Sequence, residues 1–323
     1  VPNDNDQELN LPWGDSIEEK PDNATRIYFQ NINGIKATND FASASEIGYS
    51  ADANQIDILC LAETNLDWGF KNSQHACESH LRPFLTVSKL VTASSSITYE
   101  SPYQPGGVAT MVGGNILGRL SESEADSHGL GRRTTCSFSG KENTKLTIIT
   151  AYQVCNDNIS RNSTKTAYLQ QWTLLRTTHG ILDPDPRKQF IMDLDSLITQ
   201  LRNQGHEILL LLDANESFSD NICRIKGLAR KHGLADLHTR QHGLEGQPAN
   251  YNRGNRKIDY ILGSSEVAKN TLRAGITSFD SLSDHRGLFI DVDFSAILGG
   301  PATPITAAQY RDLHSTDPKA TAK

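Results

Sequence analysis

Apolar residues along the chain fall into short runs, which are separated by polar segments that contain glycine, proline, asparagine and aspartate. Runs of this length, bounded by turn-forming residues, are typical of β-strands rather than of helices. The pattern therefore predicts a strand-rich protein. The expected strands are 26–31, 56–61, 107–112, 146–152, 207–213, 257–262 and 287–294.

Helical spacing is clearest after Asp185, which is a good N-cap and precedes a proline at the first helical position. Apolar residues from Phe190 to Leu201 then recur with the helical period, and Gly205 ends the segment. Strands outnumber helices, and several neighbouring strands are close enough in sequence to pair in antiparallel fashion. Two further helices are expected, at 168–175 and 219–233.

The composition is that of a globular protein. Of the 323 residues, 37% are hydrophobic and 21% are charged, and a chain of this length buries a substantial core. No apolar run approaches the ~20 residues that a membrane-spanning helix needs, so no membrane partner is expected. We predict an acidic flexible leader (1–25), one domain (26–295) and a polar tail or linker (296–323).

The net charge of −7 is unevenly distributed. The leader holds seven of the 38 acidic residues and one of the 31 basic residues, so the rest of the chain is almost neutral. A neutral domain differs from the basic domains of typical non-specific DNA-binding proteins. It does not exclude a nuclease, because a cleft can be locally basic and a metal ion adds positive charge.

Five cysteines are scattered along the chain without zinc-binding or Cys-x-x-Cys spacing. Cys60 lies in an apolar run and is expected to be buried. The pattern predicts that no disulfide forms, and it indicates a reducing, intracellular setting, nuclear or cytoplasmic.

Polar residues stand where two of the expected strands end. Asn31 and Asn33 follow the first strand, and alternation would place them on one side. The alternative is a simple turn, because Asn33-Gly34 is a strong turn former. Glu63 ends the next strand, where a carboxylate needs a partner such as a hard divalent cation. A salt bridge or a helix N-terminus is the alternative for Glu63.

Acidic residues also occur at or within later strands. Four leucines lead into Asp213 and Asn215, which the two-residue period of a strand aims at one site; helix capping by Asn215 is the alternative. Asp259 lies within a short apolar strand and needs a hydrogen-bond partner. His285, which follows Asp284, is a candidate partner whose tautomer Asp259 would set. The alternative for His285 is an ordinary surface loop.

Taken in order, six such segments resemble the endonuclease/exonuclease/phosphatase superfamily, which includes DNase I, the AP endonucleases and the endonucleases of non-LTR retrotransposons, the last being most similar. The resemblance covers about residues 26–294. It implies an α/β fold in which two β-sheets pack face to face, helices flank them, and the site lies at one edge. The segments are Asn31-Ile32-Asn33-Gly34, Leu61-Ala62-Glu63-Thr64, Thr150-Ala151-Tyr152, Asp213-Ala214-Asn215, Ile258-Asp259-Tyr260 and Ser283-Asp284-His285.

The resemblance implies a metal site. Glu63 matches the principal ligand, with Asn33 and Asp284 near the ion directly or through water. Some relatives carry aspartate where Asn33 stands, so weaker metal affinity is expected. Mg²⁺ is the implied cofactor, with Mn²⁺ as an alternative.

The resemblance also implies catalytic roles. Attack on a phosphodiester builds negative charge on the phosphoryl oxygens, which cations neutralise while a carboxylate aligns the water. Asp213 matches the residue that positions or deprotonates the water, and His285, oriented by Asp259, matches the group that stabilises the charge. Phosphate contact or support of the attacking group is implied for Asn31, Asn215 and Tyr152.

Some positions depart from the relatives. Tyr152 stands where DNase I has a second histidine, and the loop 251–256 lacks the tryptophan usual in AP endonucleases, so abasic-site specificity is not expected. After Tyr152 the chain does not read Pro-Asn, and either Gln153 or Asn156 is the substitute; Asn156 is taken as substrate-binding. A basic cluster is expected to contact phosphates or else to form a solvated loop: Arg253, Arg256 and Lys257.

The function expected from these residues is metal-dependent hydrolysis of phosphodiester bonds in duplex DNA, by a retroelement-type nicking endonuclease. The alternatives are a phosphatase or phosphodiesterase of small-molecule or lipid phosphates, a stand-alone repair nuclease and an inactive binding module. Because the sequence has no starting Met and the domain is flanked by a polar leader and tail, we also expect a module of a longer polyprotein with a reverse-transcriptase region.

Overall fold

The computed structural model describes residues 17–37, 41–85, 87–98, 100–156, 165–279 and 282–303. Within these residues the strands form two six-stranded sheets. In the first sheet, β1 and β2 run parallel and all other neighbours are antiparallel. The first sheet has the order β11 (Thr271–Ile276), β12 (Leu288–Val292), β1 (Thr25–Asn31), β2 (Ile58–Ala62), β4 (Val108–Gly113) and β3 (Ser88–Ala93).

The second sheet repeats this plan. Its one parallel pair among the described strands is β7 and β8, next to each other at the centre. Each sheet is therefore mixed, with its parallel pair inside. The second sheet has the order β5 (Leu120–Ala125), β6 (Arg133–Ser139), β7 (Lys145–Tyr152), β8 (His206–Asp213), β10 (Asp259–Gly263) and β9 (Ala235–Asp236).

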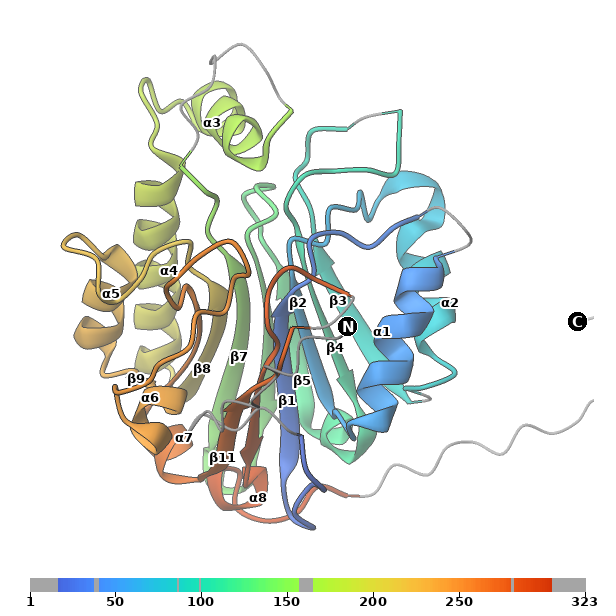
Figure 1. Cartoon of the computed structure of the whole chain (residues 1–323), viewed down its shortest axis with the longest axis vertical. Coiled ribbons are helices and arrows are strands. Elements are labelled where there is room, and N and C mark those ends of the chain that lie inside the picture. The colour runs from blue at the N-terminus through green and yellow to red at the C-terminus, as the bar shows by residue number, and fades with distance from the viewer. Residues whose placement is uncertain are drawn as a thin grey trace, which may run out of the picture.

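Helices cover the outer faces of the two sheets (Figure 1). The first sheet is flanked by α1 (Ala42–Ala53) and α2 (Ser73–Leu81), and the second by α4 (Pro186–Asn203) and α5 (Arg224–His232), while α3 (Ala167–Thr177) lies at the top of the view, above the strand ends. Shorter helices are α6 (Leu237–His242), α7 (Ser265–Lys269) and α8 (Phe294–Ile297), and the 3₁₀ turns are η1 (Phe70–Asn72), η2 (Gly114–Arg119) and η3 (Lys141–Asn143).

The leucine run in β8 shows how this layering follows from the sequence. Leu209 and Leu211 point into the core between the two sheets, whereas Leu210 and Leu212 pack with residues of α4 and α5. All four are completely buried, and burying a leucine contributes about 1.5–3 kcal/mol. The run is continuous because the strand is covered on both faces. The same run delivers Asp213 to the end of the sheet.

All seven expected strands are present, with ends shifted by at most two residues. The strands that the apolar pattern missed are β3, β5, β6, β9 and β11. Two physical reasons apply. β5 is an edge strand whose residues are all at least partly exposed, so it has no apolar face to detect. β6 buries a threonine- and serine-rich sequence by pairing its hydroxyls, Thr134 with Thr110 of the other sheet and Ser137 with Thr147 of the neighbouring strand β7.

The helix expected at 219–233 begins later than predicted. α5 starts at Arg224, capped by Cys223, and the preceding residues form a turn in which the Ser217 amide donates to Asp220. Ile222, within the expected range of this helix, is 79% exposed. The helices α3 and α4 lie where they were expected. The additional helices α1 and α2 were not predicted, because their apolar stripes are weak.

The ends of the described chain are tied to the domain. Lys20, within the predicted leader, forms an ion pair with Asp57 at 2.8 Å, while residues 1–16 lie outside the described part. Past α8, Leu298 is buried and its carbonyl accepts from the Lys141 amide; residues 304–323 also lie outside the description. The three-region division therefore stays a prediction. No helix in the described part is long and apolar enough to cross a membrane.

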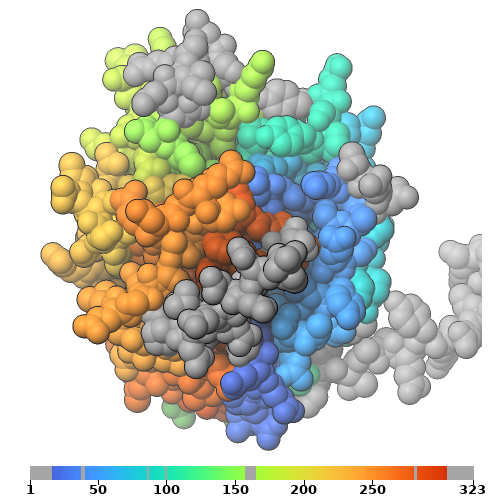
Figure 2. Space-filling model, viewed as in Figure 1, coloured from blue at the N-terminus to red at the C-terminus, as the bar shows by residue number. Residues whose placement is uncertain are grey.

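Segments far apart in sequence meet on one face of the molecule. Figure 2 shows the blue N-terminal segments beside the orange and red C-terminal ones, as expected from the pairing of β1 with β12. The inner strands β1 and β8 therefore bring their final residues, Asn31 and Asp213, to the same region between the sheets.

Candidate functional site

Asn31 links the two sheets at the candidate site. Its side-chain amide donates to Glu63 Oε2 at 2.8 Å and to Asp213 Oδ2 at 2.8 Å. Asn31 is 1% exposed, so these bonds are shielded from water and hold their geometry. The first strand thus places one neutral donor between two carboxylates from different sheets.

Glu63 leaves the end of β2 in a left-handed backbone conformation, with φ of 53°. This conformation is uncommon for a residue with a side chain, and such residues concentrate at functional sites. The carboxylate also accepts from the Tyr152 hydroxyl at 2.7 Å. Burial and the Glu63 charge raise the pKa of Tyr152 well above its ordinary value, so the hydroxyl stays protonated. Within the described part of the chain, no basic side chain pairs with Glu63.

Asp213 ends β8 and is completely buried. Its carboxylate accepts from the Asn215 amide nitrogen at 2.9 Å and from the Asn215 side chain at 3.2 Å. Burial raises the pKa of Asp213 well above the ordinary value, and the nearby Asp259 raises it further, whereas His285 opposes the shift. A carboxylate with a raised pKa is a better proton acceptor than an ordinary one.

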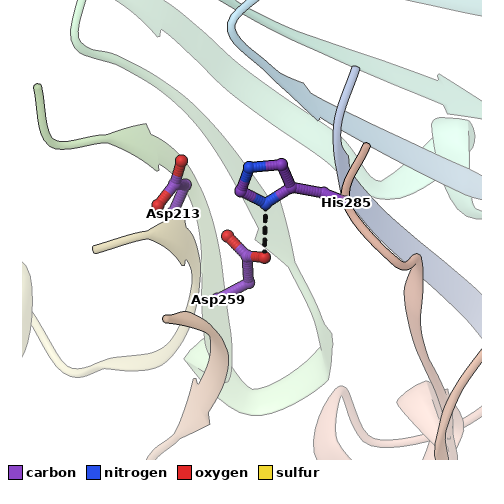
Figure 3. A group of neighbouring side chains, drawn as sticks. All are labelled: Asp213, Asp259 and His285. Carbon is purple, nitrogen blue, oxygen red and sulfur yellow. Dashed lines mark hydrogen bonds and ion pairs between the residues drawn. The ribbon is translucent and has the colours of Figure 1, made fainter. Parts of the chain in front are cut away.

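Asp259 begins β10 and lies opposite Asp213 in the antiparallel register. Its Oδ2 lies 2.8 Å from Nδ1 of His285, which comes from the loop before β12 (Figure 3). Burial by itself lowers the pKa of His285, but the Asp259 charge and hydrogen bond outweigh it and raise the pKa to about 9. The imidazole is therefore charged at neutral pH. The predicted pairing of Asp259 with His285 is confirmed.

Asp213, Asp259 and His285 bring three potential metal-ligand atoms within 4.8 Å of one another (Figure 3). Within this group, Asp259 Oδ2 already engages Nδ1 of His285 in an ion pair at 2.8 Å. The other Asp259 oxygen, Oδ1, is buried and finds no hydrogen-bond donor among the described residues.

Asn33 does not share the orientation of Asn31. β1 ends at Asn31, so strand alternation stops there, and Asn33 adopts φ of 47° with an exposed side chain. Its backbone amide donates to Asn31 Oδ1 at 3.0 Å. The turn interpretation is therefore correct for the backbone of Asn33. A mainly apolar cavity of about 530 Å³ opens beside it, lined also by Ile35, Asn65 and Tyr103.

Asp284 lies at the partly exposed rim, 3.8 Å from a guanidinium nitrogen of Arg253. Arg253 is 75% exposed, and Arg256, also exposed, pairs with Asp220. Both arginines remain accessible to a polyanion. Asn156 is exposed, after the end of β7.

Lys257 was expected to belong to a basic cluster that contacts phosphates or forms a solvated loop, and the structure contradicts this expectation. It is 2% exposed and its ammonium group forms a buried ion pair with Asp236 at 2.8 Å. The strand β10 follows directly, so the ion pair anchors the start of the strand that carries Asp259. Lys257 is therefore a structural residue and does not reach a substrate.

Two supporting residues are Gln153, whose role the sequence left open, and Arg187, which the sequence did not single out. Gln153 is buried and its side chain donates to the Ala214 carbonyl at 2.6 Å. Arg187, from the first turn of α4, donates to the Val154 and Asn215 carbonyls and to Glu216. These contacts fix the loops that follow β7 and β8. Their partners are distant in sequence, so no local pattern identifies them.

Comparison with known protein families gives no match, and comparison with curated proteins gives none either. Solved structures do match. An AP endonuclease from Leishmania major is 13% identical, covers 89% of this chain and 95% of its own, and has a TM-score of 0.61. A 3′ phosphatase from Neisseria bound to a product DNA hairpin is 17% identical, with 84% and 100% covered and a TM-score of 0.55.

The catalytic domain of human Nocturnin, with a bound sulfate anion, is 17% identical, covers 83% of this chain and 92% of its own, and has a TM-score of 0.52. The chain thus has the DNase I-like fold of the endonuclease/exonuclease/phosphatase proteins. The expected fold class, two packed sheets flanked by helices, is confirmed.

Proposed function

We propose that this chain is a metal-dependent phosphodiesterase that cleaves DNA. One observation carries the proposal: Asn31 joins Glu63 to Asp213 by hydrogen bonds, and on the strand that faces Asp213, Asp259 holds a charged His285. Attack on a phosphodiester requires an anion, a proton acceptor and a fixed cation. Glu63, Asp213 and His285 would supply them in that order.

The residues fit a divalent cation. Glu63 is partly exposed and its described partners are the neutral donors Asn31 and Tyr152. Asp284 is partly exposed and belongs to the loop whose Ser283 hydroxyl donates to the Asn31 carbonyl. Glu63 and Asp284 would hold the ion, with Asn33 at its exposed edge, and oxygen ligands suit Mg²⁺ or Mn²⁺. When bound, the ion would neutralise charge on the phosphate and on the leaving oxygen.

The chain's own residues would carry the proton and charge movements. Asp213, whose pKa is raised, would align a water and accept its proton, while Asn215 keeps the carboxylate oriented. His285, charged up to about pH 9, would donate from Nε2 to a phosphoryl oxygen, because Nδ1 is taken by Asp259. Tyr152 and Asn31 would hold the Glu63 carboxylate in place through their hydrogen bonds and would contact the phosphate.

DNA is the substrate that the comparisons favour. The Leishmania protein is an AP endonuclease, and the Neisseria protein is a 3′ phosphatase solved with product DNA. The exposed Arg253 and Arg256 would contact backbone phosphates. The loop 251–256 contains no tryptophan, which supports nicking of ordinary duplex DNA, as in a retroelement endonuclease, rather than recognition of an abasic site.

The test is plasmid nicking. Supercoiled plasmid is incubated with the protein and Mg²⁺, with Mn²⁺, or with EDTA. We expect conversion to the open circle in either metal and none in EDTA. Glu63→Ala is expected to remove nearly all activity, and Glu78→Ala, on α2, is the matched surface control. Full activity in EDTA would refute metal dependence.

A phosphatase is the second candidate, because a 3′ phosphatase has this fold. Oligonucleotides with a 3′-terminal phosphate and soluble inositol phosphates are compared with the plasmid. Release of inorganic phosphate without nicking would replace the endonuclease with a phosphatase. A retroelement role is examined separately, by reading the gene for a reverse-transcriptase region in the same open reading frame.

A further inference from the structure

Asn250 is a completely buried polar residue outside the set described above. It lies between α6 and β10, and its relative exposure is 0%. A buried amide side chain needs hydrogen-bond partners, since an unsatisfied one is costly. The identity of those partners indicates what Asn250 does.

The Asn250 side chain binds the backbone that carries Asp259. Its Oδ1 accepts from the Ile258 amide at 2.8 Å, and its Nδ2 donates to the Asp259 carbonyl at 3.0 Å. The amide therefore offers the same donor and acceptor pair that a neighbouring strand would offer. Asp259 is the first residue of β10, so this pair fixes the strand where the catalytic carboxylate emerges.

The Asn250 backbone binds the loop that carries His285. Its carbonyl accepts from the Arg286 amide at 2.9 Å, and two residues later the Asn252 amide donates to the Asp284 carbonyl at 2.9 Å. Tyr251, between them, forms an antiparallel bridge with His285, and its ring lies 4.9 Å from the imidazole. The segment 250–252 is thus a short strand partner for the His285 loop.

We propose that Asn250 is a positioning residue that sets the distance between Asp259 and His285. Asn250 binds the Asp259 backbone through its side chain and the His285 loop through its backbone carbonyl. Neither segment can therefore shift without the other. The 2.8 Å contact between Asp259 Oδ2 and His285 Nδ1 then follows from Asn250. The role rests on the proposed function, but the geometry is measurable without activity.

The first experiment compares Asn250→Ala with Thr147→Val in the plasmid assay. Thr147 is also completely buried and also loses two side-chain hydrogen bonds on substitution, to Ser137 and His206, but it lies at the opposite end of β7 from Tyr152. We expect Asn250→Ala to lower kcat by about 10- to 100-fold with little change in KM. Thr147→Val is expected to lower thermal stability and to leave kcat unchanged.

A second readout does not need turnover. The hydrogen-bonded Nδ1 proton of His285 gives a downfield imidazole NMR signal, assigned by its absence in His285→Gln. We expect this signal to be lost or broadened in Asn250→Ala and retained in Thr147→Val. If Asn250→Ala does not fold, Asn250→Ser is used, and it is expected to weaken the signal and kcat to an intermediate degree.

The outcomes separate the two proposals. A folded Asn250 variant with an unchanged His285 signal and unchanged kcat would overturn the positioning role. A wild-type protein that shows the signal, loses it in the Asn250 variant and cleaves no phosphodiester would refute the proposed function and leave the positioning role standing. Additivity supplies a further check: in an Asp259→Asn background, Asn250→Ala should change kcat by no more than about twofold.

Discussion

Asp213 and Asp259 face each other across the antiparallel strands β8 and β10. Burial raises the pKa of Asp213 well above its ordinary value, and the negative charge of the facing Asp259 raises it further. His285 reduces the repulsion by pairing with Asp259. Under the proposed function, Asp213 would accept a proton and Asp259 would hold the charged His285.

Asp259→Asn is expected to retain the fold and to lower kcat by about 10²-fold or more, because the imidazole loses its orientation and its counter-charge. Single-turnover nicking rates measure the effect, and circular dichroism confirms folding. An enzyme with nearly wild-type kcat after this change would show that His285 does not need Asp259.

Activity is expected to decline as pH rises through about 9, where His285 loses its proton. In Asp259→Asn the decline should move to lower pH, because the charge that raises the His285 pKa is gone. The free energy of unfolding is also expected to decrease as the pH rises. The folded-state pKa is above the unfolded value of 6.5, so the stabilisation is fully present below pH 6.5 and is lost as pH rises through about 9. Urea unfolding across this range tests it.

Asn31→Ala is expected to lower kcat by about 10- to 100-fold, because Glu63 and Asp213 lose the donor that they share. Asn54→Ala is the matched control. Its side chain caps the end of α1 through the Ser50 carbonyl, so a loss of stability without a loss of kcat is expected there. Equal kcat values in the two variants would contradict the bridging role.

Substitution of Lys257 is expected to change stability, whereas substitution of Arg253 is expected to change DNA binding. Lys257→Met leaves Asp236 buried without its cation, which typically destabilises by about 3–5 kcal/mol. Arg253→Gln should leave stability unchanged, because the side chain is 75% exposed, but it should reduce the salt dependence of DNA binding by about one phosphate contact. Thermal melts and binding isotherms at several salt concentrations distinguish these results.

None of the five cysteines, all within the described residues, forms a disulfide, and a thiol titration of denatured, unreduced protein should find five thiols. In the native protein Cys155, which is exposed, should react first. Burial raises the pKa of Cys60, Cys77 and Cys136 to about 12, so these thiols should stay unreactive until unfolding. Fewer than five thiols after denaturation would indicate a disulfide.

The sequence by itself determined the parts of the site that depend on neighbouring residues in the chain. Glu63, Asp213 and Asp259 each stand at the end or start of an apolar run, and such runs form strands because alternate side chains are buried. The leucine run before Asp213 was therefore enough to predict both the strand and the exit of its carboxylate. The placement of Asp259 near His285 was also expected from the chemistry of a buried acid.

Only the tertiary structure decided how these parts meet. Asn31 bonds to Asp213 across 182 positions, and Lys257 is buried because Asp236 lies beneath it. Asn33 looked like a second inward-facing asparagine, but the strand ends at Asn31 and the turn rotates Asn33 outward. Asn250 carried no local signal at all. Hydrophobic periodicity encodes which face of a strand is buried, whereas the partner of a polar side chain depends on which segments the two sheets bring together.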